Sequence, residues 1–433
     1  MLEVTNSVVE QAPDWDALAL PDWYLDLQRK AWDDFLSLPM PKRGDEPWRF
    51  ANLKKQVLGR FEAAQQIDAE LAKNIQSRSA LLETVAGKFV FANEQLLTAD
   101  RPSAEGLLCL PLREAIETHG PLFQEHFMTQ EAPLGSDKFA KLHKSRAVSG
   151  LFVYVPAGVE VELPIEAYHW VAGMNQSMLP HTLIVTGENA KVTVVDHFKS
   201  AATDQAGFCC GVVDLVAGRG SKIRYVSCQT LSDDSSNIQL STTLASADAD
   251  VKSLQVQLGS QWSRTESVSH MAGKGANSDM LSVAVPSAEQ EIDQRTLQHH
   301  ADPNTKSDLL YKNALFGKGR SIFAGLIKVD EGAHHTDSYQ TCRNLFLSDD
   351  ADANAMPGLE IDADQVKCSH GSTSSPITEE ELFYFNARGI PSNMAKQLIT
   401  SGFTGEVIAK LGDEAVELMV GALVEAKFRK TYG

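Results

Sequence analysis

A regular repeat in the middle of this chain restricts the folds that it can adopt. From about residue 148 to 370, short runs of Val, Ile and Leu alternate with turns rich in Gly, Asp and Asn. The polar turns before successive strands lie at Ala190, Ser221, Asp250, Asn277 and Lys306, in steps of 31, 29, 27 and 29 residues. Such a steady step with almost no helical pattern favours a stacked β-solenoid, whose rungs bury their apolar faces against neighbours. A two-sheet sandwich with glycine turns is the alternative.

Residues 1–147 are predicted to be mainly helical, in contrast to the repeat. Leu25, Trp32, Phe35 and Leu36 make one apolar face of a helix that Pro39 ends. The segment WRFANLKKQVLGRF (residues 48–61) is a second amphipathic candidate, and residues 62–85 are a third helical stretch rich in Ala, Glu, Leu and Gln. We therefore expect a helical N-terminal region before a β core over 148–375.

Residues 376–433 are predicted to be helical again. Thr378 and Glu381 have the spacing of a capping box, and the acidic first turn suits the helix dipole. Gly389 is expected to end this helix, and a second helix is expected from Ser392 to Gly402. A third is expected from about Asp413. Three short amphipathic helices form a thin layer, which we expect a partner surface to complete.

The composition excludes several classes of function. The chain has 39 Lys and Arg against 57 Asp and Glu, a formal charge of −18, which repels nucleic acids and anionic membranes. No run approaches the ~20 apolar residues that span a bilayer, and the acidic segment 1–16 does not have the pattern of a signal peptide. The 6 cysteines include no CxxC pair, so we expect a cytoplasmic protein with reduced thiols and no closed zinc site.

The most suggestive chemical cluster is KCSHGST, which contains Cys368 and His370. Residues two apart in a strand point to the same side, so this thiol and imidazole could bind iron or another borderline metal. Two ligands do not saturate a metal, so a complete site needs a further group from this chain or another protein. A buried cysteine beside a hydrogen-bonded histidine is the alternative.

Other possible sites are weaker. His335, Asp337 and Cys342 could form a stand-alone metal site, although a solvated turn explains the same residues. His299 and His300 fit structural roles better, and the pair 209–210 fits small buried thiols. Neither GKGAN nor GKGRS matches a phosphate loop, and there is no GxSxG elbow. The sequence thus carries no self-sufficient catalytic motif, and we expect that the protein is not an enzyme.

One long stretch resembles a known family. Residues 320–390, from RSIFAGLIKVDEG through KCSHGST to ELFYFNARGI, resemble the shared signature of the SufB/SufD proteins of iron–sulfur cluster assembly. The resemblance continues through PSNMAKQLITSGFTGEVIAKL, and the N-terminal PWRFANL matches an element common in SufD proteins. It implies a right-handed parallel β-helix between helical N- and C-terminal segments. It also implies a complex in which SufB and SufD pair through their β-helices and each binds one SufC ATPase through its C-terminal helices.

The resemblance also distinguishes the two paralogues. In SufB-like chains the position of Phe385 resembles a cysteine used in cluster assembly, whereas the KCSHG form here is SufD-like. The family's assembly-site histidine maps onto His370, with Cys368 as an auxiliary or structural residue. Motif matching suggests the ATPase contact at Arg388, Gly389, Ile390 and Phe403.

The leading hypothesis from the sequence is therefore a non-catalytic scaffold subunit. We expect a transient iron–sulfur cluster or iron at the interface with a SufB-like paralogue, and no cofactor bound stably by the isolated chain. A carbohydrate-active β-helix enzyme and a stand-alone metal-binding β-protein are the alternatives. The sequence does not distinguish whether the isolated chain forms a homodimer, binds a flavin or supplies iron.

Overall fold

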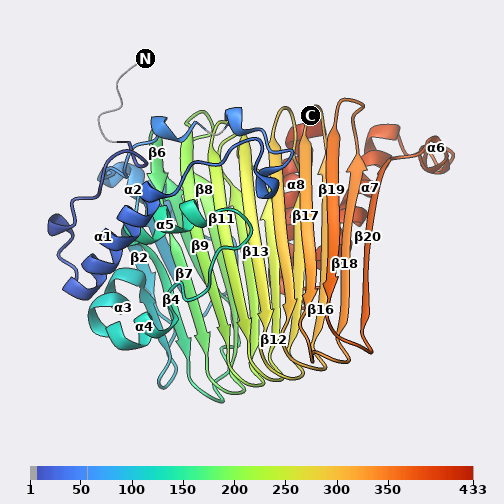
Figure 1. The fold of residues 1–433 in the computed structure, drawn as a ribbon. Helices are drawn as coiled ribbons and strands as arrows, with labels where there is room; N and C mark the ends of the chain where they lie inside the picture. The colour runs from blue at the N-terminus through green and yellow to red at the C-terminus, as the bar shows by residue number, and fades with distance from the viewer. Residues whose placement is uncertain (1–6, 56, 433) are drawn as a thin grey trace.

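The protein is a stack of parallel β-rungs with helices at its N-terminal end and on one face (Figure 1). The computed structural model describes residues 7–55 and 57–432, so the first six residues of the acidic N-terminal segment lie outside the described residues. Each repeat contributes one strand to each of two sheets, which face one another across the core. The predicted parallel β-helix between helical segments is therefore correct.

We call the two sheets A and B. In spatial order, sheet A contains β19 (Asp352–Ile361), β17 (Arg320–Val329), β15 (Glu291–His300), β13 (Trp262–Met271), β11 (Ser236–Ala245), β9 (Gly207–Ala217), β7 (His181–Thr186), β4 (Gly150–Val155) and β3 (Leu108–Pro111), with β6 (Gln176–Met178) paired to β9. Sheet B contains β2 (Gln95–Asp100), β1 (Gly87–Ala92), β5 (Ile165–Val171), β8 (Lys191–Ser200), β10 (Lys222–Thr230), β12 (Asp250–Gln257), β14 (Asn277–Ala284), β16 (Lys306–Leu315), β18 (Asp337–Phe346) and β20 (Lys367–Pro376).

The strand register explains the repeat seen in the sequence. Lys191, Lys222, Asp250, Asn277 and Lys306 are paired in turn along sheet B, so the predicted turn positions mark the starts of consecutive strands. All pairs from β5 to β20 within this sheet are parallel. The structure does contain two facing sheets, as a sandwich would. Their strands are parallel neighbours from successive repeats, however, so the sandwich alternative is rejected.

The N-terminal region contains more than helices. Its helices are α1 (Asp22–Ser37), α2 (Ala69–Ser77), α3 (Leu112–Thr118), α4 (Gly120–His126) and α5 (Asp137–Arg146). Strands β1 and β2 form an antiparallel hairpin that extends sheet B, and β3 pairs with β4 at the end of sheet A. The two sheets therefore begin before residue 148, and the stretch 62–85 contains only the short helix α2.

The predicted helix over residues 48–61 is wrong. The segment contains the short 3₁₀ helices Glu46–Trp48, Leu53–Lys55 and Leu58–Arg60 instead, and Asp16–Leu18 is another. Carbonyl oxygens of residues 47, 49 and 50 accept hydrogen bonds from Arg264, Arg295 and Arg320 of sheet A, at 3.0, 2.8 and 2.8 Å. These carbonyls are not available for the i to i+4 pattern of an α-helix, because distant strands use them.

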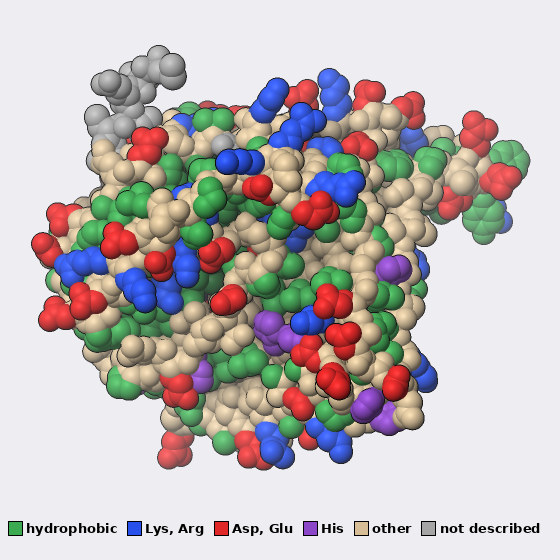
Figure 2. Space-filling model, viewed as in Figure 1, with side chains coloured by type: hydrophobic (Ala, Val, Ile, Leu, Met, Phe, Trp, Pro, Cys, Tyr) green, Lys and Arg blue, Asp and Glu red, His purple; other side chains and the backbone are tan. Residues whose placement is uncertain are grey.

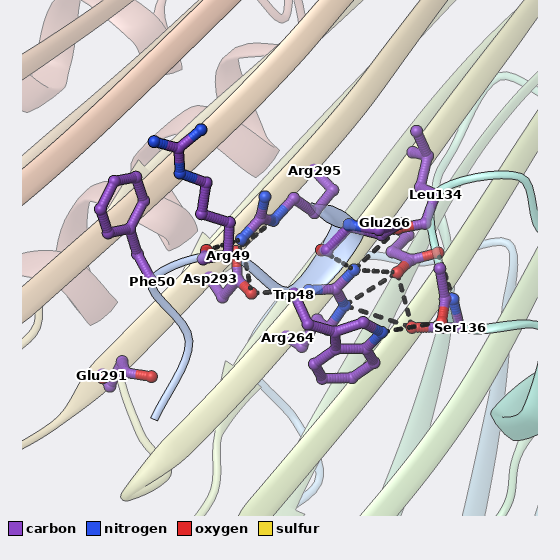
Figure 3. A network of polar contacts seen from close by, with 12 residues as sticks. Trp48, Arg49, Phe50, Leu134, Ser136, Arg264, Glu266, Glu291, Asp293 and Arg295 are labelled. Atoms are coloured by element: carbon purple, nitrogen blue, oxygen red, sulfur yellow. Dashed lines mark hydrogen bonds and ion pairs between the residues drawn. The ribbon is translucent and has the colours of Figure 1, made fainter. Parts of the chain in front are cut away.

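Residues 46–52, which we call the N-terminal strap, are held against sheet A by a buried ionic network (Figure 3). Arg264 is fully buried and pairs with Glu266 and Asp293 at 2.6 and 2.7 Å. Its guanidinium carbon lies 3.8 Å from the ring centroid of Trp48. Because buried charges are costly unless paired, this network specifies where the strap docks.

The C-terminal region forms α6 (Glu379–Asn386), α7 (Ser392–Ile408) and α8 (Glu414–Tyr432). The predicted capping box of Thr378 and Glu381 is present, and Gly389 has a φ of +77° after α6. The predicted stop at Gly402 is wrong, because α7 continues and buries Val407 and Ile408 against sheet B. Helix α8 packs on the same face, whereas α6 projects beyond β20 (Figure 1). Among the described residues, none of the helices is both long and apolar enough to cross a bilayer.

Candidate functional site

The C-terminal end of the solenoid is an open rung formed by β19 and β20. Each is the last strand of its sheet, with β17 and β18 as its respective sheet neighbour. Inner rungs are sealed by neighbours on both sides, and most side chains in them are buried. Every residue of β20 is exposed or half-buried. This end therefore presents both an unpaired strand edge and the inner surface of the core.

His370 lies on that inner surface. It is the register partner of Gln340 on β18, and Ser338 is the partner of Cys368. Neighbouring residues in a parallel sheet point to the same side, and Gln340 is fully buried between the sheets. The prediction that Cys368 and His370 share one face is therefore correct, and the face is the interior one.

The two predicted ligands differ in environment. Cys368 is half-buried and packs against Ile327, Val329 and Ala333. Burial raises the pKa of its thiol, and the nearby carboxylate of Asp337 raises it further, so the thiol keeps its proton near neutral pH. His370 is exposed at the open end. His370 is thus the more accessible ligand of the two.

Gln340 lies directly behind His370 on the neighbouring strand. It is fully buried, and neither atom of its amide has a hydrogen-bond partner among the described residues. The amide reaches across the core to Gly325 of sheet A, where an added Cβ would lie 1.6 Å from Nε2. Both amide atoms of Gln239, on the inner strand β11, also have no partner among the described residues, so this property does not by itself mark the open end.

The rim of the open rung is apolar on the sheet A side. Leu359 and Ile361 of β19 are 39% and 38% exposed. They are the register partners of Ile327 and Val329, which are fully buried in the rung below. The end of the solenoid therefore exposes the same kind of surface that its inner rungs bury against one another. Sequence reasoning missed Gln340, Leu359 and Ile361, because only the register shows that they belong to the last two rungs.

The proposed stand-alone metal site does not form. His335 lies in a turn with φ of +61° before β18, and Asp337 is exposed at the start of that strand. Cys342 lies on the opposite, inner face of β18 and is buried, which raises the pKa of its thiol to about 12. An odd spacing in a strand places Asp337 and Cys342 on opposite faces. Within residues 7–55 and 57–432, no group of three or more His, Cys, Asp or Glu side chains is placed to hold a metal ion.

The other cysteine and histidine pairs are structural. Cys209 and Cys210 are fully buried. His300 is buried and bonds to Thr305 and Ser307 at 2.8 and 2.9 Å, and burial lowers the pKa of its imidazole to about 3. His299 points the other way and contacts Asp330 at 2.7 Å. These contacts agree with the structural interpretation of both pairs.

The residues predicted to contact an ATPase fall in two places. Arg388 and Gly389 are exposed and Ile390 is half-buried, in the turn between α6 and α7. Arg388 lies over the ring of Tyr384, with its guanidinium carbon 3.5 Å from the centroid. Phe403 lies further along the chain, within α7. The ammonium nitrogen of Lys312 lies 4.5 Å from the centroid of its ring. Part of Phe403 is therefore used to hold α7 on sheet B.

Together, the fold and this end define a two-sheet parallel β-helix protein with one open rung that presents a histidine and a thiol. Comparisons with known proteins assign it further. Residues 169–403 match the family described as "SUF system FeS cluster assembly, SufBD core domain", and residues 23–167 match "SufBD protein N-terminal region". The chain belongs to the SufB/SufD family of iron–sulfur cluster assembly proteins.

Individual relatives agree with this assignment. The chain is 27% identical over 422 residues to a chloroplastic SufBD-family iron–sulfur cluster assembly protein of Arabidopsis thaliana, covering 91% of this chain and 75% of the relative. It is 24% identical over 410 residues to the iron–sulfur cluster assembly protein SufB of Bacillus subtilis, covering 92% and 88%. A SufBD-family protein of Staphylococcus epidermidis is 25% identical over 420 residues, covering 92% and 88%.

Proposed function

We propose that this chain is a non-catalytic, SufD-like scaffold subunit that offers His370 to a nascent iron–sulfur cluster across a joint with a SufB-like paralogue. The observation that carries the proposal is the open rung, where His370 is exposed on the inner face of the last strand. A single imidazole and a protonated thiol do not make a complete ligand set for iron. The partner chain supplies the rest of the set.

The joint forms by stacking of a paralogue's last rung on β19 and β20. Unpaired strand edges are completed by another strand, and Leu359 and Ile361 are apolar side chains that such a rung covers. A cluster held there is cargo, so the isolated chain binds neither iron nor a cluster stably. The same edge also allows a homodimer when the paralogue is absent.

The C-terminal helices contact a SufC-like ATPase. The projecting helix α6 has no buried residue, and Phe383 and Tyr384 on it are 72% and 55% exposed. Arg388, Gly389 and Ile390 follow it directly, and Phe403 lies on the next helix. Because α7 and α8 are packed on sheet B, movement of the ATPase subunits on ATP binding is passed to the β-helix pair and exposes the His370 joint.

The paralogue is assigned from the residue at position 385. Phe385 is a half-buried aromatic side chain in α6, where a SufB-like chain has a cysteine used in cluster assembly. Without that thiol this chain takes the complementary role, with His370 as its ligand and Cys368 as an auxiliary. All 6 cysteines are free, as expected in the reducing cytoplasm that we propose as its location.

Co-expression with SufB-like and SufC-like chains from the same genome tests this function. The expected result is one complex containing all three chains, with iron and sulfide after anaerobic reconstitution and neither in the chain purified alone. A chain that stays monomeric beside both candidates, or that loads a cluster unaided, would contradict the proposal.

A further inference from the structure

The N-terminal strap forms one wall of a basic pocket that the proposed function does not use. The pocket has a volume of about 900 Å³ and is lined by the strap, by the turn before it, by the two residues after it and by Arg320 of β17. Five of its ten lining residues are cations and none is a carboxylate, in a chain whose formal charge is −18. The cationic lining residues are Lys42, Arg43, Arg49, Lys54 and Arg320.

Most of this charge is available to a ligand. The side chains of Lys42, Arg43, Arg49 and Lys54 are exposed, and Arg49 is 3.5 Å from Glu46 in a surface pair. Arg320 differs, because Glu291 and Asp352 pair with it at 3.0 and 2.9 Å. Figure 2 shows several Lys and Arg side chains along the upper edge of the same face, with Asp and Glu side chains among them. The lining side chains therefore carry net positive charge in an acidic molecule, with Glu46, Glu291 and Asp352 beside two of the cations.

The pocket wall is fixed by the buried network beneath it. Arg295 and Arg320 donate to the carbonyls of Arg49 and Phe50, and Glu291 accepts from the backbone N–H of Asn52 at 2.7 Å. The strap backbone is thus held from below, and the side chains of Arg49 and Phe50 extend away from the Arg264 cluster (Figure 3). Such support lowers the ordering cost of binding a ligand.

Phe50 gives the pocket an aromatic surface. It is 41% exposed and has a φ of +69°, a left-handed conformation that is strained for a bulky side chain. The guanidinium of Arg49 lies over its ring, 5.1 Å from the centroid. Strain of this kind persists only where the surroundings fix it, and it is concentrated at ligand sites.

We propose that this basic pocket binds a small phosphate-bearing molecule with a planar ring, of the nucleotide class. Guanidinium and ammonium groups pair with phosphate oxygens, and Phe50 stacks on the ring. The volume is within the range of small-molecule sites, roughly 300–1,000 Å³. Long polyanions are disfavoured, because the rest of the surface is acidic. This inference is independent of the scaffold role and of His370.

Binding of ADP to the full chain, measured by calorimetry at two salt concentrations, tests the proposal. We expect saturable 1:1 binding that weakens at least tenfold in Arg43→Glu/Lys54→Glu and less than twofold in the matched control Lys73→Glu/Lys274→Glu, whose lysines are exposed elsewhere. Phe50→Ala should weaken ADP about fivefold and leave pyrophosphate unchanged. All substituted side chains are exposed, and unchanged melting temperatures verify folding.

Three results would overturn the proposal. The first is no saturable ADP binding, and the second is equal loss in both double variants, which indicates unspecific attraction. The third is tighter binding of pyrophosphate, a hexaglutamate peptide or a short oligothymidylate than of ADP, which assigns the pocket to another class of ligand.

Discussion

Gln340 and His370 are register partners on β18 and β20, and their side chains continue one inner column of the solenoid, yet the first is fully buried and the second is exposed. The difference arises from position alone, because β18 lies between two strands and β20 ends its sheet. A further rung stacked on β20 would give His370 the environment that Gln340 has. The open rung is therefore both the joint and the ligand site in our account.

Substitution of the apolar rim tests where the paralogue binds. Leu359→Lys/Ile361→Lys places two charges at the joint, where they must be desolvated on association. We expect loss of co-purification with the SufB-like chain and little change in the melting temperature of the isolated protein. Leu96→Lys/Leu163→Lys, at exposed apolar positions elsewhere, is the control. Undiminished co-purification of the Leu359→Lys/Ile361→Lys protein, or equal loss with the control pair, would contradict a joint at this rim.

The exposed faces of α6 and α7 are the predicted contact with the ATPase. Deletion of residues 376–433 should abolish that contact, but it would also strip α7 and α8 from sheet B. Phe383→Asp/Leu398→Asp is more informative, because these side chains are 72% and 48% exposed. We expect at least tenfold weaker binding of the SufC-like chain in a pull-down titration. Leu36→Asp on α1 is the control, and equal binding by all three proteins would place the contact elsewhere.

Docking of the strap depends on Arg264. Arg264→Met leaves the buried charge of Glu266 without a cationic partner and removes the contact with Trp48, while Asp293 keeps Arg295 at 2.6 Å. Breaking a buried pair in this way costs about 3–5 kcal/mol. Urea unfolding should show a loss of that order, compared with less than about 0.5 kcal/mol for the exposed control Lys222→Met. A variant as stable as the parent would show that the network does not hold the strap.

Asp214 makes the stability of the fold depend on pH. Burial raises the pKa of its carboxyl to about 7. The carbonyl of Cys210 accepts from Nδ1 of His143, and the chain His143–His181–Asp214 continues at 3.1 and 3.5 Å. Burial lowers the pKa of both imidazoles, and with both neutral the lone pair on Nε2 of His181 faces Asp214 and disfavours a charged carboxylate there.

The folded state thus binds more protons than the unfolded state, and stability falls as pH rises from about 4 to about 7. Asp214→Asn removes the titrating carboxyl, and its amide oxygen can still accept from the N–H of Met128. As pH rises from 5 to 8, the free energy of unfolding of Asp214→Asn should increase relative to that of the parent by on the order of 2–3 kcal/mol. Denaturant unfolding across this range measures the effect, with the exposed Asp204→Asn as the control. Parallel pH profiles for the parent and Asp214→Asn would contradict the proton assignment.

Local patterns predicted the solenoid well, because each repeat is a continuous stretch of sequence with its own apolar strands and polar turns. The turn positions from Ala190 to Lys306 lie at strand starts or one residue before them, and the capping box at Thr378 formed as expected. The helix predicted over residues 48–61 was wrong because the conformation of this segment depends on distant residues. Arginines more than 200 residues later in the chain hold it. No local signal reports such contacts.

The hairpin of β1 and β2 could have been found. Phe89, Val90 and Phe91 lead to a two-residue turn at Asn93 and Glu94, which both have positive φ. That is the geometry of a tight hairpin turn, but Glu replaces the usual Gly. Glu94 is tolerated there because its carboxylate accepts from the N–H of Leu179 at 3.0 Å. For the site, the sequence identified Cys368 and His370 but did not show that they end the stack.

The central claim is tested most directly by the cluster content of the reconstituted three-chain complex with His370→Ala. Our account predicts that the complex assembles normally but that its iron and sulfide fall at least tenfold, whereas Ser372→Ala on the same strand keeps the parental content. Full iron and sulfide in an intact His370→Ala complex would contradict it.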